Sequence, residues 1–155
     1  MITGPALKPA DFYHTGIIVP DIAAAAARLS VVSGYEWTKP VEATLSVTTE
    51  GGVYEVPFEF VYSLQAPHLE LVTEVPGTVW TASPGTATHH LGYWADDLAT
   101  TARDLEKAGF RQEARPSGDI LNSFAYYTDN TGLRIEIVDR AMFPDWPGFL
   151  EAMRA

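Results

Sequence analysis

The chain has 155 residues, of which 46% are hydrophobic and 19% charged, a composition typical of a globular protein with a packed core. Its formal net charge is -10, and its basic residues stand singly, which argues against binding to nucleic acid or to an anionic membrane surface. Because it contains no cysteine, any bound metal would be held by His, Asp, Glu or water. The apolar runs fall short of the roughly 20 residues that span a bilayer, and no signal peptide is recognised, so we expect a cytoplasmic protein.

The first half of the chain predicts a strand, a helix and three further strands. Residues 12–19 form an apolar, Ile- and Val-rich run typical of a buried strand, and the Ala-rich stretch 22–32, which follows Pro20 and Asp21, predicts a helix that ends at Gly34. Strands are expected at residues 44–49, 54–64 and 69–73. Residues 75–88, rich in Pro, Gly, Ser and Thr, are interpreted as a linker.

The second half repeats this order. It predicts a strand at 89–95, a helix at 97–108 stopped by Gly109, and strands at 110–114, 123–128 and 133–138. A short terminal helix is expected at 143–154. We therefore predict one domain over residues 1–155, made of module 12–74, module 89–139 and a C-terminal helical tail, 143–154.

The repetition extends to individual residues. "YHTGIIVPDIAAAAARL" at 13–29 aligns with "HHLGYWADDLATTARDL" at 89–105, and "FVYSLQAPHLELV" at 60–72 aligns with "FAYYTDNTGLRIEIV" at 124–138. Each module thereby carries one His on its first strand and one Glu on its last. The residues are His14 and Glu70 in the first module, and His90 and Glu136 in the second. A shared core explains the matched apolar positions, but it leaves these polar ones unexplained.

Strand alternation indicates where these side chains point. In "LEL" at 69–71 and "IEI" at 135–137 the aliphatic residues share one face and the Glu lies on the other. A carboxylate buried without a partner costs several kcal/mol, roughly, so each Glu needs a partner or an open face. If the helices cover the aliphatic face, the two His and two Glu are expected to converge on the opposite face when the modules pair.

With "GIIVPD" near His14, "HLELV" around Glu70, "LGYWADD" after His90 and "RIEIVD" around Glu136, the chain resembles the vicinal oxygen chelate superfamily. This superfamily includes glyoxalase I, methylmalonyl-CoA epimerase, extradiol dioxygenases and the bleomycin and fosfomycin resistance proteins. The resemblance extends from about residue 12 to residue 139. It implies an α+β fold in which two tandem βαβββ modules form a cupped mixed sheet, with one divalent metal ion bound by His14, Glu70, His90 and Glu136.

Such a ligand set suits Zn, Ni, Co, Mn or Fe without choosing among them. A carbonyl bound to the metal would have a more acidic neighbouring C-H group, and Glu136 or Glu70 is the candidate catalytic base. Four aromatic residues are candidates for lining a substrate pocket: Trp37, Tyr62, Trp94 and Tyr126. His89 is interpreted as structural because it should face the opposite side of its strand from His90, and His68 because the matching residue of the second module is Arg134.

The resemblance therefore implies a metal-dependent isomerase, epimerase or lyase that abstracts a proton from a small molecule. An acidic binding protein of the antibiotic-resistance or sequestration type is the alternative, and the net charge suits it. An extradiol-type dioxygenase is a further alternative, which the fourth protein ligand disfavours. Folding could still gather Arg111, Arg115 and Arg134 around an anionic substrate such as a coenzyme A thioester. We also expect a homodimer in which the two modules pair within one chain.

Overall fold

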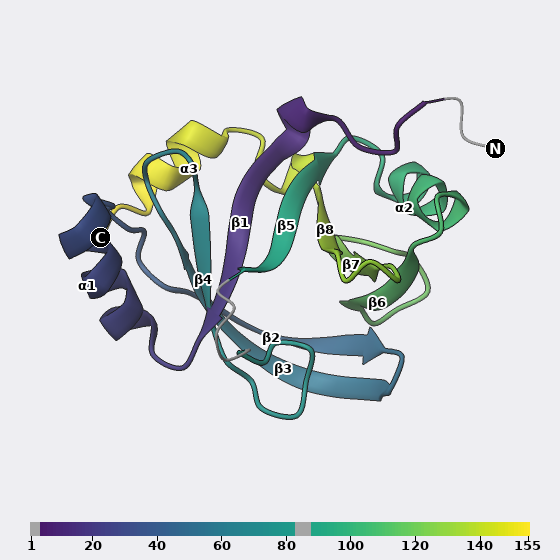
Figure 1. Cartoon of the computed structure of the whole chain (residues 1–155), viewed down its shortest axis with the longest axis horizontal. Coiled ribbons are helices and arrows are strands. Elements are labelled where there is room, and N and C mark those ends of the chain that lie inside the picture. Colours follow the sequence, from purple (N-terminus) through teal and green to yellow (C-terminus); the bar gives the residue numbers. More distant parts are fainter. Residues whose placement is uncertain (1–3, 83–87) are drawn as a thin grey trace. The chain divides into compact units, whose positions relative to one another are not determined.

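The computed structural model describes residues 4–82 and 88–155, and two βαβββ modules follow one another along them (Figure 1). The first module comprises β1 (Phe12–Val19), α1 (Ile22–Ser33), β2 (Val41–Thr49), β3 (Gly52–Tyr62) and β4 (Leu69–Thr73). The second comprises β5 (Thr88–Ala95), α2 (Leu98–Lys107), β6 (Arg111–Pro116), β7 (Phe124–Thr128) and β8 (Arg134–Asp139). Short 3-10 helices cover Pro9–Asp11 and Arg140–Met142, and α3 (Trp146–Ala152) follows.

The strands form a mixed sheet with hydrogen-bonded neighbours in the order β1-β4-β3-β2-β6-β7-β8-β5. Within each module the first strand runs parallel to the last one: β1 pairs with β4, and β5 pairs with β8. The last strand is also antiparallel to the strand before it, β3 or β7. The two modules therefore have the same internal topology, and the predicted α+β class with two tandem modules is confirmed.

The residues gather into two compact units that differ from the sequence modules. The His14 unit contains His14–Leu45, Val56–His89 and Asp145–Ala155. The His90 unit contains Met1–Tyr13, Ser46–Glu55 and His90–Pro144. The end of the β2–β3 hairpin thus belongs to the His90 unit, where β2 pairs antiparallel with β6 around Thr48 and Arg115.

Both main helices begin at the aspartates that the repeat aligns. The side chain of Asp21 accepts a hydrogen bond from the Ala24 backbone N-H at 3.1 Å, and Asp97 accepts one from Thr100 at the same distance. These bonds satisfy amides that have no partner in the first turn of a helix. α1 ends at Gly34, whose φ of 76° is a left-handed conformation that glycine adopts without steric cost.

Each helix covers the aliphatic face of its own module. α1 packs against β4, where Ile22 contacts a buried cluster that contains Val61 and Leu71. In the His90 unit, α2 (labelled in Figure 1) packs its apolar face against β6, β7 and β8. That second cluster contains Leu98, Ala102, Leu105, Ala125, Tyr127, Ile135 and Ile137. Leu71, Ile135 and Ile137 are the strand neighbours of Glu70 and Glu136, so the two glutamates lie on the face away from the helices.

Some boundaries differ from those expected. β2 begins at Val41 instead of Thr44, and the terminal helix begins at Trp146 instead of Phe143, because Asp145 caps it by accepting a hydrogen bond from the Gly148 N-H. None of the described helices is both long and apolar enough to cross a membrane.

Residues 75–82 of the predicted linker are packed against the protein, and its last residue, Thr88, is the first residue of β5. Trp80 is only 1% exposed, and its ring lies edge-on to that of Phe58 with centroids 4.7 Å apart. The turn-forming residues of this segment predict a loop, but they do not indicate that the large apolar side chain of Trp80 is buried. Residues 83–87 of the linker lie outside the described residues.

Candidate metal centre

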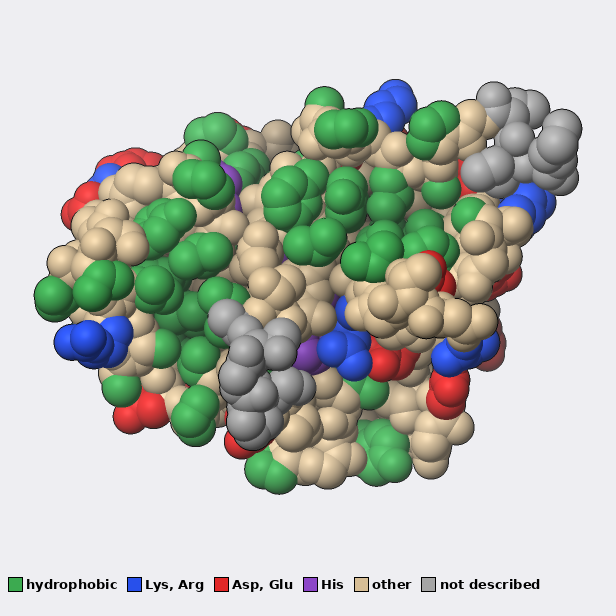
Figure 2. Space-filling model, in the orientation of Figure 1, with side chains coloured by type: hydrophobic (Ala, Val, Ile, Leu, Met, Phe, Trp, Pro, Cys, Tyr) green, Lys and Arg blue, Asp and Glu red, His purple; other side chains and the backbone are tan. Residues whose placement is uncertain are grey.

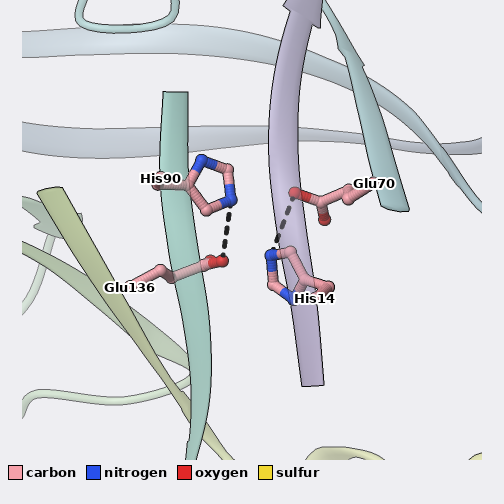
Figure 3. Close-up of side chains that lie close together, drawn as sticks. All are labelled: His14, Glu70, His90 and Glu136. Carbon is pink, nitrogen blue, oxygen red and sulfur yellow. Dashed lines mark ion pairs between the residues drawn. The ribbon is translucent and has the colours of Figure 1, made fainter. Parts of the chain in front are cut away.

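In the His14 unit, a histidine and a glutamate meet on neighbouring parallel strands. Gly16 of β1 is the register partner of Glu70 of β4, and Glu70 therefore reaches back along the sheet toward His14, two residues before Gly16. The His14 Nε2 atom lies 3.4 Å from the Glu70 Oε1 atom (Figure 3). Both residues are buried, with exposed fractions of 1% and 6%. Glycine at position 16 places no side chain beside the carboxylate, which leaves room for it.

The His90 unit contains the same arrangement. Gly92 of β5 is the register partner of Glu136 of β8, and the His90 Nε2 atom lies 3.3 Å from the Glu136 Oε1 atom (Figure 3). Their exposed fractions are 1% and 8%. The repeat in the sequence is therefore also a repeat in geometry, since each module holds a buried imidazole beside a buried carboxylate at equivalent register.

The two distances are long for hydrogen bonds, and they are compatible with adjacent ligands of one metal ion. A charge-assisted hydrogen bond between nitrogen and a carboxylate oxygen measures about 2.7–2.9 Å, which is shorter than either contact. Nitrogen and oxygen ligands that bind one divalent ion at roughly 2.0–2.2 Å lie about 3 Å or slightly more from one another. Imidazole and carboxylate are also the donor types expected for Zn, Ni, Co, Mn or Fe(II). All four side chains are buried, and each offers one ligand atom.

Two of the four predicted pocket residues lie beside these pairs. Tyr62 and Tyr126 are the register partners of Glu70 and Glu136 on the neighbouring antiparallel strands. The Tyr62 ring lies edge-on to the His14 ring at 5.8 Å between centroids, and the Tyr126 hydroxyl lies 3.5 Å from the His90 Nδ1 atom. Which of the two atoms donates depends on the tautomer of His90: Nδ1 would donate to the Tyr126 oxygen if Nε2 binds a metal ion, and would accept from the hydroxyl if Nε2 donates to Glu136. Tyr126 thus orients the imidazole.

The other two pocket candidates have different surroundings. Trp94 is buried and stacks on Tyr13, with centroids 3.6 Å apart and rings inclined by 8°. Trp37 was expected in the pocket, but it packs against the cluster beneath α1, and its Nε1 atom donates to the Ala26 carbonyl and the Ser30 hydroxyl. These contacts place the Trp37 ring on the helix side of β4, and its role in a substrate pocket stays a prediction.

The three arginines considered for an anionic substrate are engaged elsewhere. Arg134 forms a two-pronged ion pair with Glu113, with nitrogen to oxygen distances of 2.7 and 3.0 Å. Arg111 lies 3.6 Å from Glu50, and Arg115 donates to a backbone carbonyl at 2.9 Å. On the face drawn in Figure 2, Lys and Arg form small separate groups, several of them next to Asp or Glu. Among the described residues, these arginines do not combine into a basic patch.

The remaining histidines make backbone contacts. The His89 Nε2 atom lies 2.7 Å from the Val79 carbonyl oxygen, which agrees with its interpretation as structural. The His68 Nδ1 atom lies 3.0 Å from the Ser63 carbonyl oxygen, but the same ring also lines a cavity below α3. That cavity could not be predicted from local sequence patterns, since its walls come from two segments far apart in the chain.

The paired βαβββ modules and their buried His-Glu pairs define a class of protein, and comparison of the sequence with family models identifies it. Residues 13–134 match the model described as the Glyoxalase/Bleomycin resistance protein/Dioxygenase superfamily. The chain therefore belongs to this superfamily, and the resemblance noted from the sequence is confirmed. A comparison with curated proteins finds no match.

Solved structures of similar fold include methylmalonyl-CoA epimerase from Mycobacterium tuberculosis, with 16% identity, a TM-score of 0.59, and coverage of 90% of this chain and 92% of that one. A variant of Streptomyces coelicolor methylmalonyl-CoA epimerase in complex with 2-nitronate-propionyl-CoA also has 16% identity and a TM-score of 0.59, over 94% and 97% of the two chains. A hypothetical protein from Bacillus halodurans C-125 has 12% identity and a TM-score of 0.59, over 83% and 92%. At these identities the likeness shows the fold alone.

Proposed function

We propose that the protein is a divalent-metal-dependent enzyme that removes a proton next to a carbonyl group of a small molecule, as an isomerase, epimerase or lyase. His14, Glu70, His90 and Glu136 together hold the ion in this proposal. The observation that carries it is the equivalence of the two buried His-Glu pairs, which occupy the same register in both modules at 3.4 and 3.3 Å. Membership of the glyoxalase superfamily supports the same assignment.

When bound, the ion polarises a substrate carbonyl and stabilises the negative charge that develops as the adjacent proton leaves. The carboxylate of Glu136 or Glu70 accepts that proton and returns it to the same or a neighbouring carbon, which completes an epimerisation or isomerisation. The histidines have fixed positions on their strands, and Tyr126 orients His90. A glutamate side chain has more rotatable bonds, so it is the ligand type that can move the proton.

The charges favour a small substrate that carries little negative charge. Some structural neighbours bind coenzyme A esters, whose phosphates need cationic partners. In this chain Arg134 is already neutralised by Glu113, and the whole chain carries a formal net charge of -10. We therefore propose an α-hydroxy ketone, keto acid or similar compound with two neighbouring oxygens, and not a coenzyme A thioester.

The test is exchange of the proton next to the carbonyl. Dihydroxyacetone and a panel of hydroxy ketones, keto acids and short thioesters would be incubated in deuterated water with metal-loaded protein, and the C-H signal followed by NMR. We expect exchange that needs metal and is lost in Glu136→Gln or Glu70→Gln, whichever is the base, while His89→Ala serves as the control. Equal exchange by wild type and both glutamine variants would contradict the proposed base.

The acidic composition favours one other function, the sequestration of a cationic small molecule without chemistry. The same experiment separates the two functions. If the panel shows no exchange and a cationic natural product such as bleomycin binds at micromolar affinity, the protein is a binding protein instead of an enzyme.

A further inference from the structure

We infer that a second small-molecule site, distinct from the metal centre, lies between α3 and the β3–β4 connection in the His14 unit. A cavity of about 340 Å³ is present there, which is within the range of small-ligand pockets. Residues from two segments far apart in the sequence line it, among them Leu64, His68, Trp146, Leu150, Glu151 and Arg154.

The backbone holds the His68 ring in one tautomer. The Ser63 carbonyl can only accept a hydrogen bond, so the His68 Nδ1 atom at 3.0 Å must donate to it. In the neutral ring this leaves Nε2 as an acceptor. The Ser63 hydroxyl donates to the Gln65 carbonyl and accepts from the Leu69 N-H, both at 2.9 Å, which fixes the connection around the histidine. Among the acceptor-bearing side chains that line the cavity, His68 therefore has a ring of defined tautomer, and its Nε2 atom is suited to an N-H or O-H group.

A fixed aromatic ring forms another wall. Trp146 stacks beside Phe149, with rings inclined by 13° and centroids 5.8 Å apart. Its ring also lies edge-on to Tyr62 at 4.9 Å and to His68 at 5.8 Å. These contacts set the orientation of the indole, and Trp146 is itself only partly buried. A flat apolar ring can pack against such a surface at little entropic cost to the protein.

The charged residues at the rim are already paired. Arg154 donates to Glu151 at 3.0 Å and to Glu36 at 3.1 Å, and the hydrogen bond to Glu151 is the main reason why the pKa of Arg154 is raised. Because Arg154 is shared between the carboxylates of Glu151 and Glu36, we do not expect the rim of the cavity to attract an anion. The occupant that fits is a neutral planar ring that carries a single N-H or O-H donor for His68.

Indole tests this site, and 1-methylindole is its matched control because it lacks only the N-H donor. Both would be titrated into the full-length protein by ligand-observed NMR and calorimetry. We expect indole to bind with a Kd of about 1 mM or tighter, from the affinity that a ligand of this size can reach. The methyl derivative should bind about threefold to tenfold more weakly, which corresponds to one hydrogen bond. Chemical shifts should change at residues 64–68 and at the Trp146 indole N-H.

Variants of His68 and His14 test whether indole binds in this cavity. His68→Phe keeps a planar side chain and removes the acceptor, so it should weaken indole binding by about the same threefold to tenfold that separates the two ligands. His68→Gln keeps an acceptor, so its affinity for indole should lie between those of His68→Phe and the wild type. His14→Ala should leave indole binding unchanged. Equal affinity for the two indoles, or loss of binding in His14→Ala, would overturn the inference. Because the comparison of the two ligands uses wild-type protein, the test does not depend on any variant being folded.

Discussion

Two buried carboxylates set this protein apart from one whose sheet serves only as a core. Leu71 beside Glu70, and Ile135 and Ile137 on either side of Glu136, belong to the apolar clusters. Only 6% of the surface of Glu70 and 8% of that of Glu136 are exposed. Burying a carboxylate is unfavourable by several kcal/mol, roughly, unless a cation or hydrogen bonds offset the cost. The histidine contacts, at 3.4 and 3.3 Å, are long for hydrogen bonds, and a divalent ion bound by both residues of a pair would place a positive charge beside each carboxylate.

The first prediction concerns metal binding. Purified wild-type protein should bind about one divalent ion per chain, as a single site with four protein ligands requires. The His14→Ala, His90→Ala double variant should bind none, and the His68→Ala, His89→Ala double variant should bind as wild type. Elemental analysis after dialysis gives the stoichiometry, and circular dichroism checks the fold. An ion retained in full by the folded His14→Ala, His90→Ala protein would remove the central claim.

The second prediction concerns the partner of His90. Tyr126→Phe removes the hydroxyl that lies 3.5 Å from the His90 Nδ1 atom and leaves the ring in place. Partners of this kind typically contribute about tenfold to a hundredfold to metal affinity, and the long contact predicts a loss near the lower end. Tyr62→Phe is the matched control, because the Tyr62 contact to His14 is through its ring. Competition with a coloured chelator measures both affinities, and equal values for the two variants would contradict a role for the Tyr126 hydroxyl.

At the scale of elements, the helices fix the direction in which the glutamates point. α2 places Leu98, Ala102 and Leu105 against β7 and β8, and this packing turns the alternate residues of β8 to the opposite face. The start of each helix is set by a capping aspartate, so the same two signals, a cap and an apolar face, orient both modules. The positions of the metal-ligand candidates are therefore a consequence of packing on the far side of the strands.

The third prediction follows from the α2 cap. Hydrogen bonds from the Thr100 backbone and side chain lower the pKa of Asp97 below its ordinary value. A lowered pKa means that the charged form stabilises the folded state at neutral pH and that this contribution is lost as the pH falls through the folded-state pKa. Asp97→Ala should therefore destabilise the protein at pH 7 and have little effect at about pH 2–3. Urea unfolding at both pH values tests this, and an equal loss at both would contradict it.

The fourth prediction concerns the core beneath α2. Leu105 is 2% exposed and belongs to the cluster that also contains Ile135 and Ile137, so Leu105→Ala should cost about 2–5 kcal/mol of unfolding free energy. The matched variant is Val31→Ala on α1, where 79% of the side chain is exposed and little change is expected. Chemical denaturation gives both values. A loss below 1 kcal/mol, roughly, for Leu105→Ala would show that α2 is not packed as described.

The elements that the sequence predicted well are those with two agreeing local signals. β1 and β4 have the predicted bounds, because an apolar run is bounded on both sides by turn-forming residues. β2 begins three residues early at Val41, where no apolar alternation marks it, and its pairing with β6 is a long-range contact that local patterns do not encode. The burial of Trp80 was also not predicted, because the turn-forming residues around it indicate a loop and local patterns do not show what its ring contacts.

The candidate site was predictable because it is repeated. A single His in a strand says little about function. His14 and His90 stand at equivalent positions, each beside a matched Glu, and this repetition indicates a shared site. Trp37 lies outside the long strands, where alternation does not indicate a face, so its contacts beneath α1 could not be predicted from the sequence. His68 could not be recognised from sequence, since Trp146 and Arg154, which complete its cavity, lie far along the chain.

At the scale of the whole molecule, the repeat leaves open how the ligands are shared between chains. A βαβββ module exposes a sheet edge and a polar face, so it must pair with another module, either within its own chain or across a dimer. In the first arrangement all four ligands come from one chain. In the second, each site takes His14 and Glu70 from one chain and His90 and Glu136 from its partner. We favour the first, in a homodimer formed by other surfaces, because modules that follow one another in sequence usually pack together.

The fifth prediction decides between these arrangements. His14→Ala and His90→Ala chains would be unfolded together, refolded as an equal mixture and assayed for bound metal. With ligands from one chain, every site in the mixture lacks a histidine, so binding should stay as low as in either variant alone. With shared ligands, half of the dimers would be mixed, and each mixed dimer would regain one intact site, so about one quarter of the wild-type metal content should return. Recovery at that level would contradict the single-chain site, and size-exclusion chromatography with light scattering would establish that dimers are present in the mixture.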